Sequence, residues 1–147
     1  MTEMQTAVAQ AEAAFAMGEI PVGAAIFQGR KLIAAAHNLT ETAQDPTAHA
    51  EILAIRQACR KLGSQRLTGC DLYVTLEPCP MCAGAILNAR LRAVYIGAPD
   101  PNAGACGSKT DLLSRQFFNH RADVFHGIEE ERCTALLHQF FAQLREK

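Results

Sequence analysis

The sequence lacks an excess of charge of either sign. Its 147 residues include 14 Lys and Arg against 15 Asp and Glu, which gives a formal net charge of −1. This balance excludes a global electrostatic attraction to nucleic acid or to an anionic membrane. A cluster of cations lies around Arg56, Arg60 and Lys61, but such charge runs are usually solvated helix faces. Any binding to nucleic acid must therefore depend on local features.

Long apolar stretches are also missing. The sequence contains no run of about 18 apolar residues, which argues against a transmembrane helix. The opening stretch MTEMQTAVAQAEAAFAMGE has neither the basic segment nor the apolar segment of a secretory signal peptide. We therefore expect no association with a membrane and a cytoplasmic location.

A second close pair of metal-ligand residues is missing as well. The cytosol keeps cysteines reduced, and close Cys spacing there indicates metal binding or catalysis. Cys79 and Cys82 form a close pair, whereas the other four Cys and the His residues are scattered. A structural zinc site has four protein ligands, often from two such pairs. The sequence therefore offers no evident fourth ligand for a structural zinc site.

Helices and strands alternate in the hydrophobic pattern. Apolar residues at helical spacing predict helices over residues 2–17, 48–62, 80–89 and 129–145. Strand-forming runs predict strands over residues 21–27, 31–36, 71–76, 93–97 and 123–128. The strand–helix–strand order from residue 71 onward predicts a right-handed crossover with parallel neighbours. We therefore expect one domain, residues 1–147, with an α/β fold in which helices flank a mixed sheet of about five strands.

Three potential metal ligands lie at the starts of two predicted helices. Cys79 and Cys82 are three positions apart, so both thiols lie on one face of a helix whose N-terminus favours thiolates. His49 follows the helix-start signal at residues 45–47. If both helices cover one side of the sheet, their N-termini meet at the same end and the three side chains converge. Three protein ligands leave one position for water, which is typical of catalytic zinc.

Glu51 completes this candidate site. It follows His49 by two residues and can border the same pocket from another side. A carboxylate beside the open metal position can take a proton from water and hand it on as a general acid. An ordinary alternative is a first-turn Glu that is stabilised by the helix dipole. The combination with three ligands favours the catalytic interpretation.

Several motifs resemble a known enzyme family. HAE at 49–51 with PCPMC at 78–82 resembles the zinc signature of the cytidine deaminase superfamily. The segments GEIPVGAAIF, DPTAHAEILAIRQA, LYVTLEPCPMCAGAIL, GAPDPNAGACGS and FFNHR are similar to those of bacterial tRNA-specific adenosine deaminases. The matching segments run from Gly18 to Arg121, and the final predicted helix fits as well.

This resemblance implies a structure and a reaction. The family has a three-layer α/β/α sandwich with a mixed five-stranded sheet, which agrees with the predicted pattern. The resemblance implies a homodimer with one zinc ion per subunit, and conversion of the wobble adenosine of a tRNA anticodon stem-loop to inosine. It assigns the zinc to His49, Cys79 and Cys82. It assigns the proton transfer to Glu51, with attack of water at C6 of adenine and loss of ammonia.

The resemblance also implies contacts with the substrate. The backbone N–H of Ala50 would meet the base near its reacting edge, and Asp100 would contact the nucleotide or its ribose. Asn38 would contact the base, because a side-chain amide both donates and accepts hydrogen bonds. Asn119 and the two residues after it would shape the RNA pocket. Asn38 also fits a turn at the end of a strand, and Asn119 also fits a surface turn.

Two departures from the family bear on the substrate. The family commonly has Lys where this chain has Asn102, and the tail after Phe141 holds only Arg145 and Lys147 as cations. The affinity for tRNA must therefore come from local cations and a shaped pocket.

Three alternatives remain at this stage. A deaminase of free bases or nucleosides, such as guanine or cytosine, shares the zinc signature. A non-catalytic zinc scaffold subunit typically lacks the glutamate, which is present here as Glu51. A structural or nucleic-acid-binding zinc module needs a fourth protein ligand.

Overall fold

The computed structural model describes residues 1–114 and 119–146. Five strands form one mixed sheet in the order β2-β1-β3-β4-β5. Their bounds are β1 Gly23–Gln28, β2 Lys31–His37, β3 Cys70–Leu76, β4 Ala93–Ala98 and β5 Asp123–Phe125. β1 runs antiparallel to both β2 and β3, whereas β3, β4 and β5 are parallel to one another. The helices are α1 Glu3–Ala16, α2 Thr40–Ala43, α3 Ala50–Leu62, α4 Pro80–Asn88 and α5 Glu130–Arg145.

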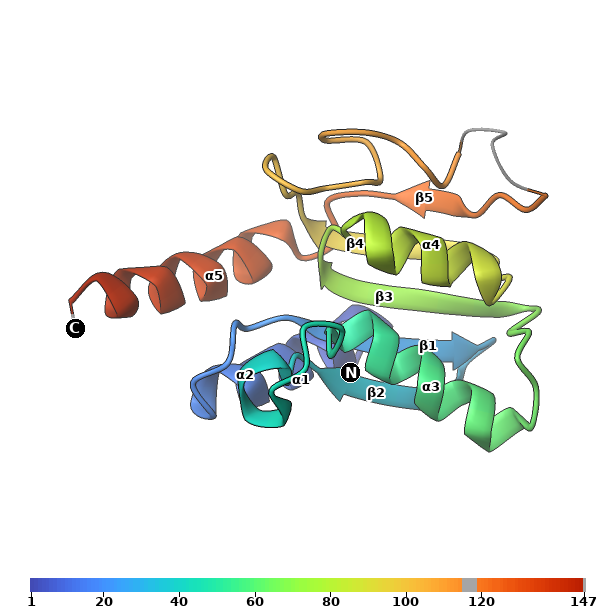
Figure 1. Cartoon of the computed structure of the whole chain (residues 1–147), viewed down its shortest axis with the longest axis horizontal. Helices are drawn as coiled ribbons and strands as arrows, with labels where there is room; N and C mark the ends of the chain where they lie inside the picture. The colour runs from blue at the N-terminus through green and yellow to red at the C-terminus, as the bar shows by residue number, and fades with distance from the viewer. Residues whose placement is uncertain (115–118, 147) are drawn as a thin grey trace.

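The sheet lies between two layers of helices. α3 and α4 cover the face seen from the front in Figure 1, while α1 and α5 pack on the other face. Alternate residues of β1 follow this division, since Ala24 and Ile26 belong to the core under α3 and α4. Ala25 and Phe27 belong to the core under α1 and α5. The predicted three-layer α/β/α sandwich with a mixed five-stranded sheet is therefore confirmed.

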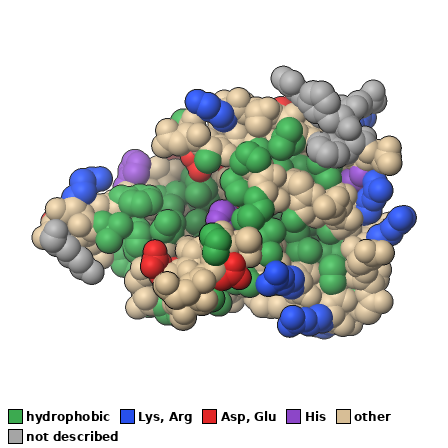
Figure 2. Space-filling model, viewed as in Figure 1, with side chains coloured by type: hydrophobic (Ala, Val, Ile, Leu, Met, Phe, Trp, Pro, Cys, Tyr) green, Lys and Arg blue, Asp and Glu red, His purple; other side chains and the backbone are tan. Residues whose placement is uncertain are grey.

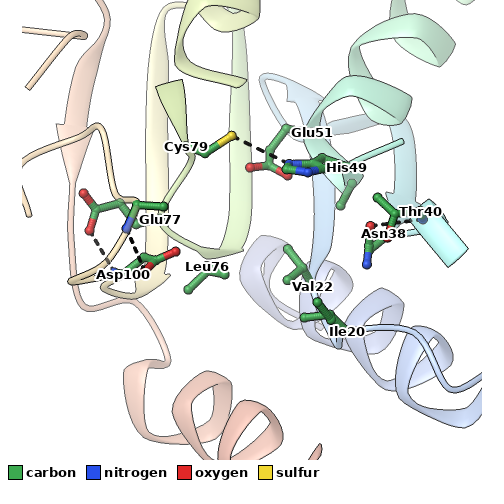
Figure 3. A pocket seen from close by; sticks show the side chains of 12 residues that line it. Ile20, Val22, Asn38, Thr40, His49, Glu51, Leu76, Glu77, Cys79 and Asp100 are labelled. Atoms are coloured by element: carbon green, nitrogen blue, oxygen red, sulfur yellow. Dashed lines mark hydrogen bonds between the residues drawn. The ribbon is translucent and has the colours of Figure 1, made fainter. Parts of the chain in front are cut away.

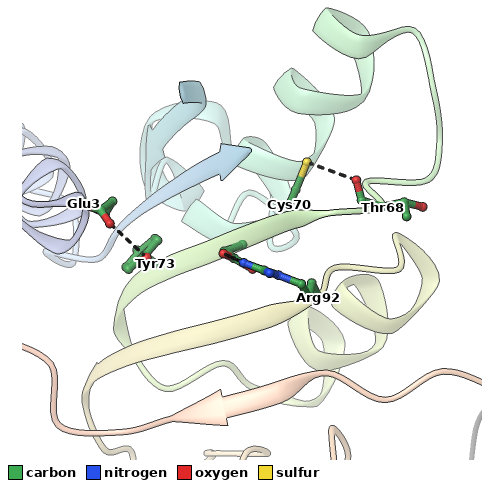
Figure 4. Close-up of polar contacts among 6 residues, drawn as sticks. Glu3, Thr68, Cys70, Tyr73 and Arg92 are labelled. Carbon is green, nitrogen blue, oxygen red and sulfur yellow. Dashed lines mark hydrogen bonds and ion pairs between the residues drawn. The ribbon is translucent and has the colours of Figure 1, made fainter. Parts of the chain in front are cut away.

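Two polar contacts at β3 join it to the neighbouring strand β4 and to the helix α1. The guanidinium group of Arg92, just before β4, pairs with the Asp71 carboxylate, with Nε 2.9 Å from Oδ1. The Tyr73 hydroxyl donates to Glu3 in the first turn of α1 at 3.3 Å (Figure 4).

Among the described residues, no helix is long and apolar enough to cross a bilayer.

The structure corrects two boundaries. The predicted helix 48–62 begins only at Ala50, because Asp45 accepts hydrogen bonds from both the N–H and the hydroxyl of Thr47 and so forms a turn. The predicted strand 123–128 ends at Phe125, because Gly127 turns the chain with a φ of +78°. The short helix α2 lies in the stretch 37–46, which was expected to be a loop.

Gly23 brings β1 very close to α1, which leads to a stability prediction. A β-carbon at Gly23 would lie 2.5 Å from the backbone nitrogen of Ala11 and closer still to the carbonyl oxygen of Ala7. Backbone cannot move aside cheaply, so we expect Gly23→Ala to lower the free energy of unfolding by about 3 kcal/mol in urea unfolding. Gly84→Ala is the matched control, because its β-carbon would meet nothing within 4 Å. Equal stability of the two variants would contradict the close packing of α1.

Candidate functional site

Two helix N-termini meet at one edge of the sheet. His49 is the N-cap residue of α3, and Cys79 is the N-cap residue of α4. Pro80 takes the first position of α4, where its missing N–H costs nothing. α4 follows directly after β3, so the turn that leaves the strand delivers Cys79, and Cys82 follows inside the helix. Because α3 and α4 lie on the same face of the sheet, the two N-termini face each other.

The structure brings His49, Cys79 and Cys82 together as a His–Cys–Cys trio. Nδ1 of His49 lies 3.7 Å from Sγ of Cys79 and 3.5 Å from Sγ of Cys82. An ion bound tetrahedrally at zinc–nitrogen and zinc–sulfur distances requires a nitrogen–sulfur separation of about 3.6 Å. Within the described part of the chain, this trio is the group whose spacing suits a metal ion. The residues therefore fit a metal that prefers thiolate and imidazole ligands.

The pKa values of the three side chains in the trio shift in ways that favour a bound cation. The hydrogen bond from Cys82 lowers the pKa of the Cys79 thiol to about 4, although burial acts in the opposite direction. The same hydrogen bond, together with burial, raises the pKa of Cys82. The hydrogen bond with Cys79 raises the pKa of His49. Ionisation of one thiol disfavours ionisation of its neighbour, and a metal ion between the two sulfurs would supply the positive charge that stabilises both thiolates.

Glu51 lies beside the trio, in the first turn of α3. Its side chain is buried, with 4% of the residue exposed. Burial raises the pKa of the Glu51 carboxyl group to about 7. Figure 3 shows Glu51 and His49 next to each other at the same wall of a pocket. The arrangement places a carboxyl group beside the His–Cys–Cys trio and at the pocket wall.

This pocket has a volume of about 190 Å³. It brings together six residues that the sequence singled out: Asn38, His49, Ala50, Glu51, Cys79 and Asp100. The other lining residues are Ile20, Val22, Thr40, Leu76, Glu77 and Ala103. Apolar walls with a few converging polar groups are typical of sites for planar small ligands such as nucleobases.

Asn38 has one end of its amide already engaged. Its Oδ1 accepts a hydrogen bond from the N–H of Thr40 at 3.3 Å, which ties it to the start of α2. The amide nitrogen is the end that can donate to a bound molecule. Oδ1 keeps a second lone pair, so the capacity of this amide to donate and to accept stays as expected from the sequence.

Asp100 follows β4 and caps its own turn. Its Oδ1 accepts from the backbone N–H groups of Asn102 and Ala103, at 3.0 and 3.2 Å. Position 102 holds Asn here, where the related family commonly has Lys. The contact of Asn102 with Asp100 uses the backbone N–H, so it does not depend on the side chain at that position.

The structure places Asn119 away from this pocket. Asp123 at the start of β5 pairs with Ala93 at the start of β4, whereas Asp100 follows the end of β4. Asn119 precedes β5 and is exposed, and the neighbouring His120 contacts the carbonyl oxygen of Leu91 at 2.8 Å. Asn119 thus lies at the opposite end of the parallel strands, and a contact between Asn119 and substrate would lie outside the pocket. The Phe pair before it falls outside the described residues.

Sequence reasoning missed two buried carboxylates near the pocket. Glu19 accepts from the N–H groups of Glu41 and Thr42 and so holds α2. Glu77, directly after β3, accepts hydrogen bonds from the loop that follows β4. Burial by itself would raise the pKa of each carboxyl group, but these hydrogen bonds outweigh it and lower the pKa of both. The available signal was an acidic residue inside each of the apolar segments GEIPV and TLEPC.

Known proteins resemble this chain in both sequence and fold. The chain matches the MafB19-like deaminase family over residues 1–145. A solved structure from a study of A-to-I editing by tRNA:A34 deaminases at the wobble position of transfer RNA superposes with a TM-score of 0.89 and 44% identity. That match covers 92% of this chain and 98% of the other. The sandwich, the trio and these matches define a deaminase of the MafB19-like class.

Two relatives with known activities show to which family within this class the chain is more similar. A tRNA-specific adenosine deaminase of Bacillus subtilis (strain 168) is 49% identical over 144 residues, which are 98% of this chain and 89% of that protein. A guanine deaminase of Nitrosomonas europaea is more distant, with 28% identity, a TM-score of 0.79, and coverage of 95% of this chain and 83% of the other. The chain belongs to the family of tRNA-specific adenosine deaminases.

Proposed function

We propose that this protein is a zinc-dependent hydrolase that converts the wobble adenosine of a tRNA anticodon stem-loop to inosine. The observation that carries the proposal is the buried Glu51 carboxyl group beside the His–Cys–Cys trio, in a pocket of about 190 Å³ with apolar walls. The name of the Bacillus subtilis relative and the subject of the solved tRNA:A34 deaminase structure support the choice of substrate.

The residues of the site divide the chemistry among them. Zinc held by His49, Cys79 and Cys82 would lower the pKa of water in its fourth position and so make water a nucleophile at neutral pH. Glu51 takes up the proton that water loses and returns a proton to the amino group leaving C6. Adenosine and water thus become inosine and ammonia.

Other residues hold the base. The amide nitrogen of Asn38 donates a hydrogen bond to the base, and Ile20, Val22 and Leu76 supply apolar surface for its faces. Ala50 has the first N–H of α3, which has no partner inside the helix and meets the reacting edge. Asp100 contacts the nucleotide from the wall formed after β4.

The assembly is part of the same proposal. All 147 residues form one deaminase domain, two copies form a homodimer with one zinc ion each, and the protein acts in the cytoplasm on tRNA.

Hydrophobic side chains gather on the face that carries α3 and α4, with Lys and Arg near its edge (Figure 2). Met81 of α4 is 37% exposed there. Asn119 contacts RNA outside the pocket. Light scattering on the purified protein measures the number of copies.

The experiment that tests the function compares four substrates under one set of conditions. An anticodon stem-loop with a wobble adenosine, free adenosine, cytidine and guanine are each given to the purified protein, and product is measured by chromatography. We expect inosine in the stem-loop and no turnover of the three small molecules. The same stem-loop with guanosine at the wobble position is the control RNA. Turnover of guanine with an unchanged stem-loop would instead favour a role like that of the guanine deaminase relatives.

A further inference from the structure

A buried carboxylate organises the pocket wall that carries Asp100. Glu77 is 2% exposed and lies between the end of β3 and the ligand Cys79. Its Oε1 accepts from the N–H of Asp100 at 3.1 Å and from the hydroxyl of Ser108. Its Oε2 accepts from the N–H groups of Cys106 and Ser108, both at 3.0 Å. Four donors from one loop thus converge on one carboxylate.

The loop is packed tightly against this carboxylate. A β-carbon at Gly104 would lie 2.5 Å from the carbonyl oxygen of Asp100 and even closer to the Glu77 carboxylate. Backbone hydrogen bonds fasten the same segment on both sides, because Glu77 donates to the carbonyl oxygen of Ala98 at 2.9 Å and Ala105 donates to that of Pro78 at 2.8 Å. The segment that leads into Cys79 and the loop that carries Asp100 are therefore held as one unit.

We propose that Glu77 is a positioning residue for the substrate nucleotide and acts through Asp100. This inference rests on the proposed function, in which Asp100 contacts the nucleotide. Figure 3 shows Glu77 and Asp100 side by side at the pocket wall opposite Asn38. Glu77 holds the backbone of Asp100, and Ser108 holds the orientation of the carboxylate. Glu77 neither binds the metal nor exchanges a proton with the substrate.

The chemistry of glutamine makes Glu77→Gln a selective test. An amide nitrogen in place of Oε2 would face two N–H donors, from Cys106 and Ser108. An amide nitrogen in place of Oε1 is tolerated better, because the hydroxyl of Ser108 can rotate and accept. This second orientation leaves the N–H of Asp100 facing another donor. The substitution therefore acts mainly on Asp100 while the side chain keeps its volume.

The experiment measures kcat and KM on the wobble-adenosine stem-loop, with metal content and melting temperature recorded for every variant. We expect Glu77→Gln to lower kcat/KM by about 10- to 100-fold, mainly through KM, with metal content unchanged. Ser108→Ala removes one hydroxyl and should lower kcat/KM in the same way but by less. Ser114→Ala is the matched control, because its hydroxyl bonds to Asp111 outside the pocket.

A double-mutant cycle separates positioning from general damage. If Glu77 acts through Asp100, adding Glu77→Gln to Asp100→Asn should cause little further loss of kcat/KM. A further loss as large as that of Glu77→Gln alone, or a parallel loss of metal, would overturn the inference. If Glu77→Gln does not fold, Ser108→Ala decides by the same cycle. Wild-type protein that leaves the stem-loop unchanged would refute the proposed function, whereas an active wild type with an equally active Glu77→Gln variant would refute this inference alone.

Discussion

Glu51→Gln is expected to lower the rate of stem-loop deamination by about 10²- to 10⁴-fold, the usual contribution of a general acid–base group. Gln has nearly the same shape, but its amide neither takes up nor returns a proton. Glu51 is 4% exposed, so the substitution exchanges a buried ionisable group for a neutral one. We therefore expect the fold to remain and the metal content to equal that of the wild type.

The measurement is a single-turnover rate constant with the metal content of the same sample. Glu131→Gln is the matched control, because this exposed residue in the first turn of α5 does not line the pocket. It should retain the wild-type rate. A Glu51→Gln variant that deaminates at the native rate would show that another group moves the proton.

Cys82→Ser is expected to abolish both metal binding and turnover. Cys82 is fully buried at the site, and a serine hydroxyl does not ionise there to replace the thiolate ligand. The wild type should contain about one zinc per chain, and the variant should contain far less. Because a ligand that binds only the native state stabilises it, a chelator should lower the stability of the wild type. The stability of Cys82→Ser should not respond to the chelator.

Elemental analysis and urea unfolding with and without chelator measure these effects. Cys59→Ser is the control, since Cys59 is a partly buried cysteine near the end of α3 and not a member of the trio. It should retain metal, turnover and the response to the chelator. Full activity in a metal-free Cys82→Ser protein would remove the metal from the proposed mechanism.

Much of the fold could be predicted because its determinants are local. The helix pattern before Gly18, the strand runs on either side of the turn at Gly29, and the strand–helix–strand order after residue 71 all appear in the structure. Each of these features depends on neighbouring residues, through periodicity, turn residues and short connections. The boundaries were less predictable: α3 begins at Ala50 because the Asp45 turn competes with the helix for the same residues.

The sequence by itself determined the chemical identity of the site. The ligand types, the spacing of Cys79 and Cys82, and the placement of Glu51 after His49 are all short-range features. Only the tertiary structure decided which distant groups meet. It brought Nδ1 of His49 to 3.7 Å from Sγ of Cys79 and placed Asn119 at the other end of the parallel strands. It also placed the Glu77 carboxylate where the N–H of Asp100 donates to it. These outcomes depend on strand order and on hydrogen bonds between segments far apart in the chain, because a buried polar group takes its partner from whichever loop the fold brings beside it.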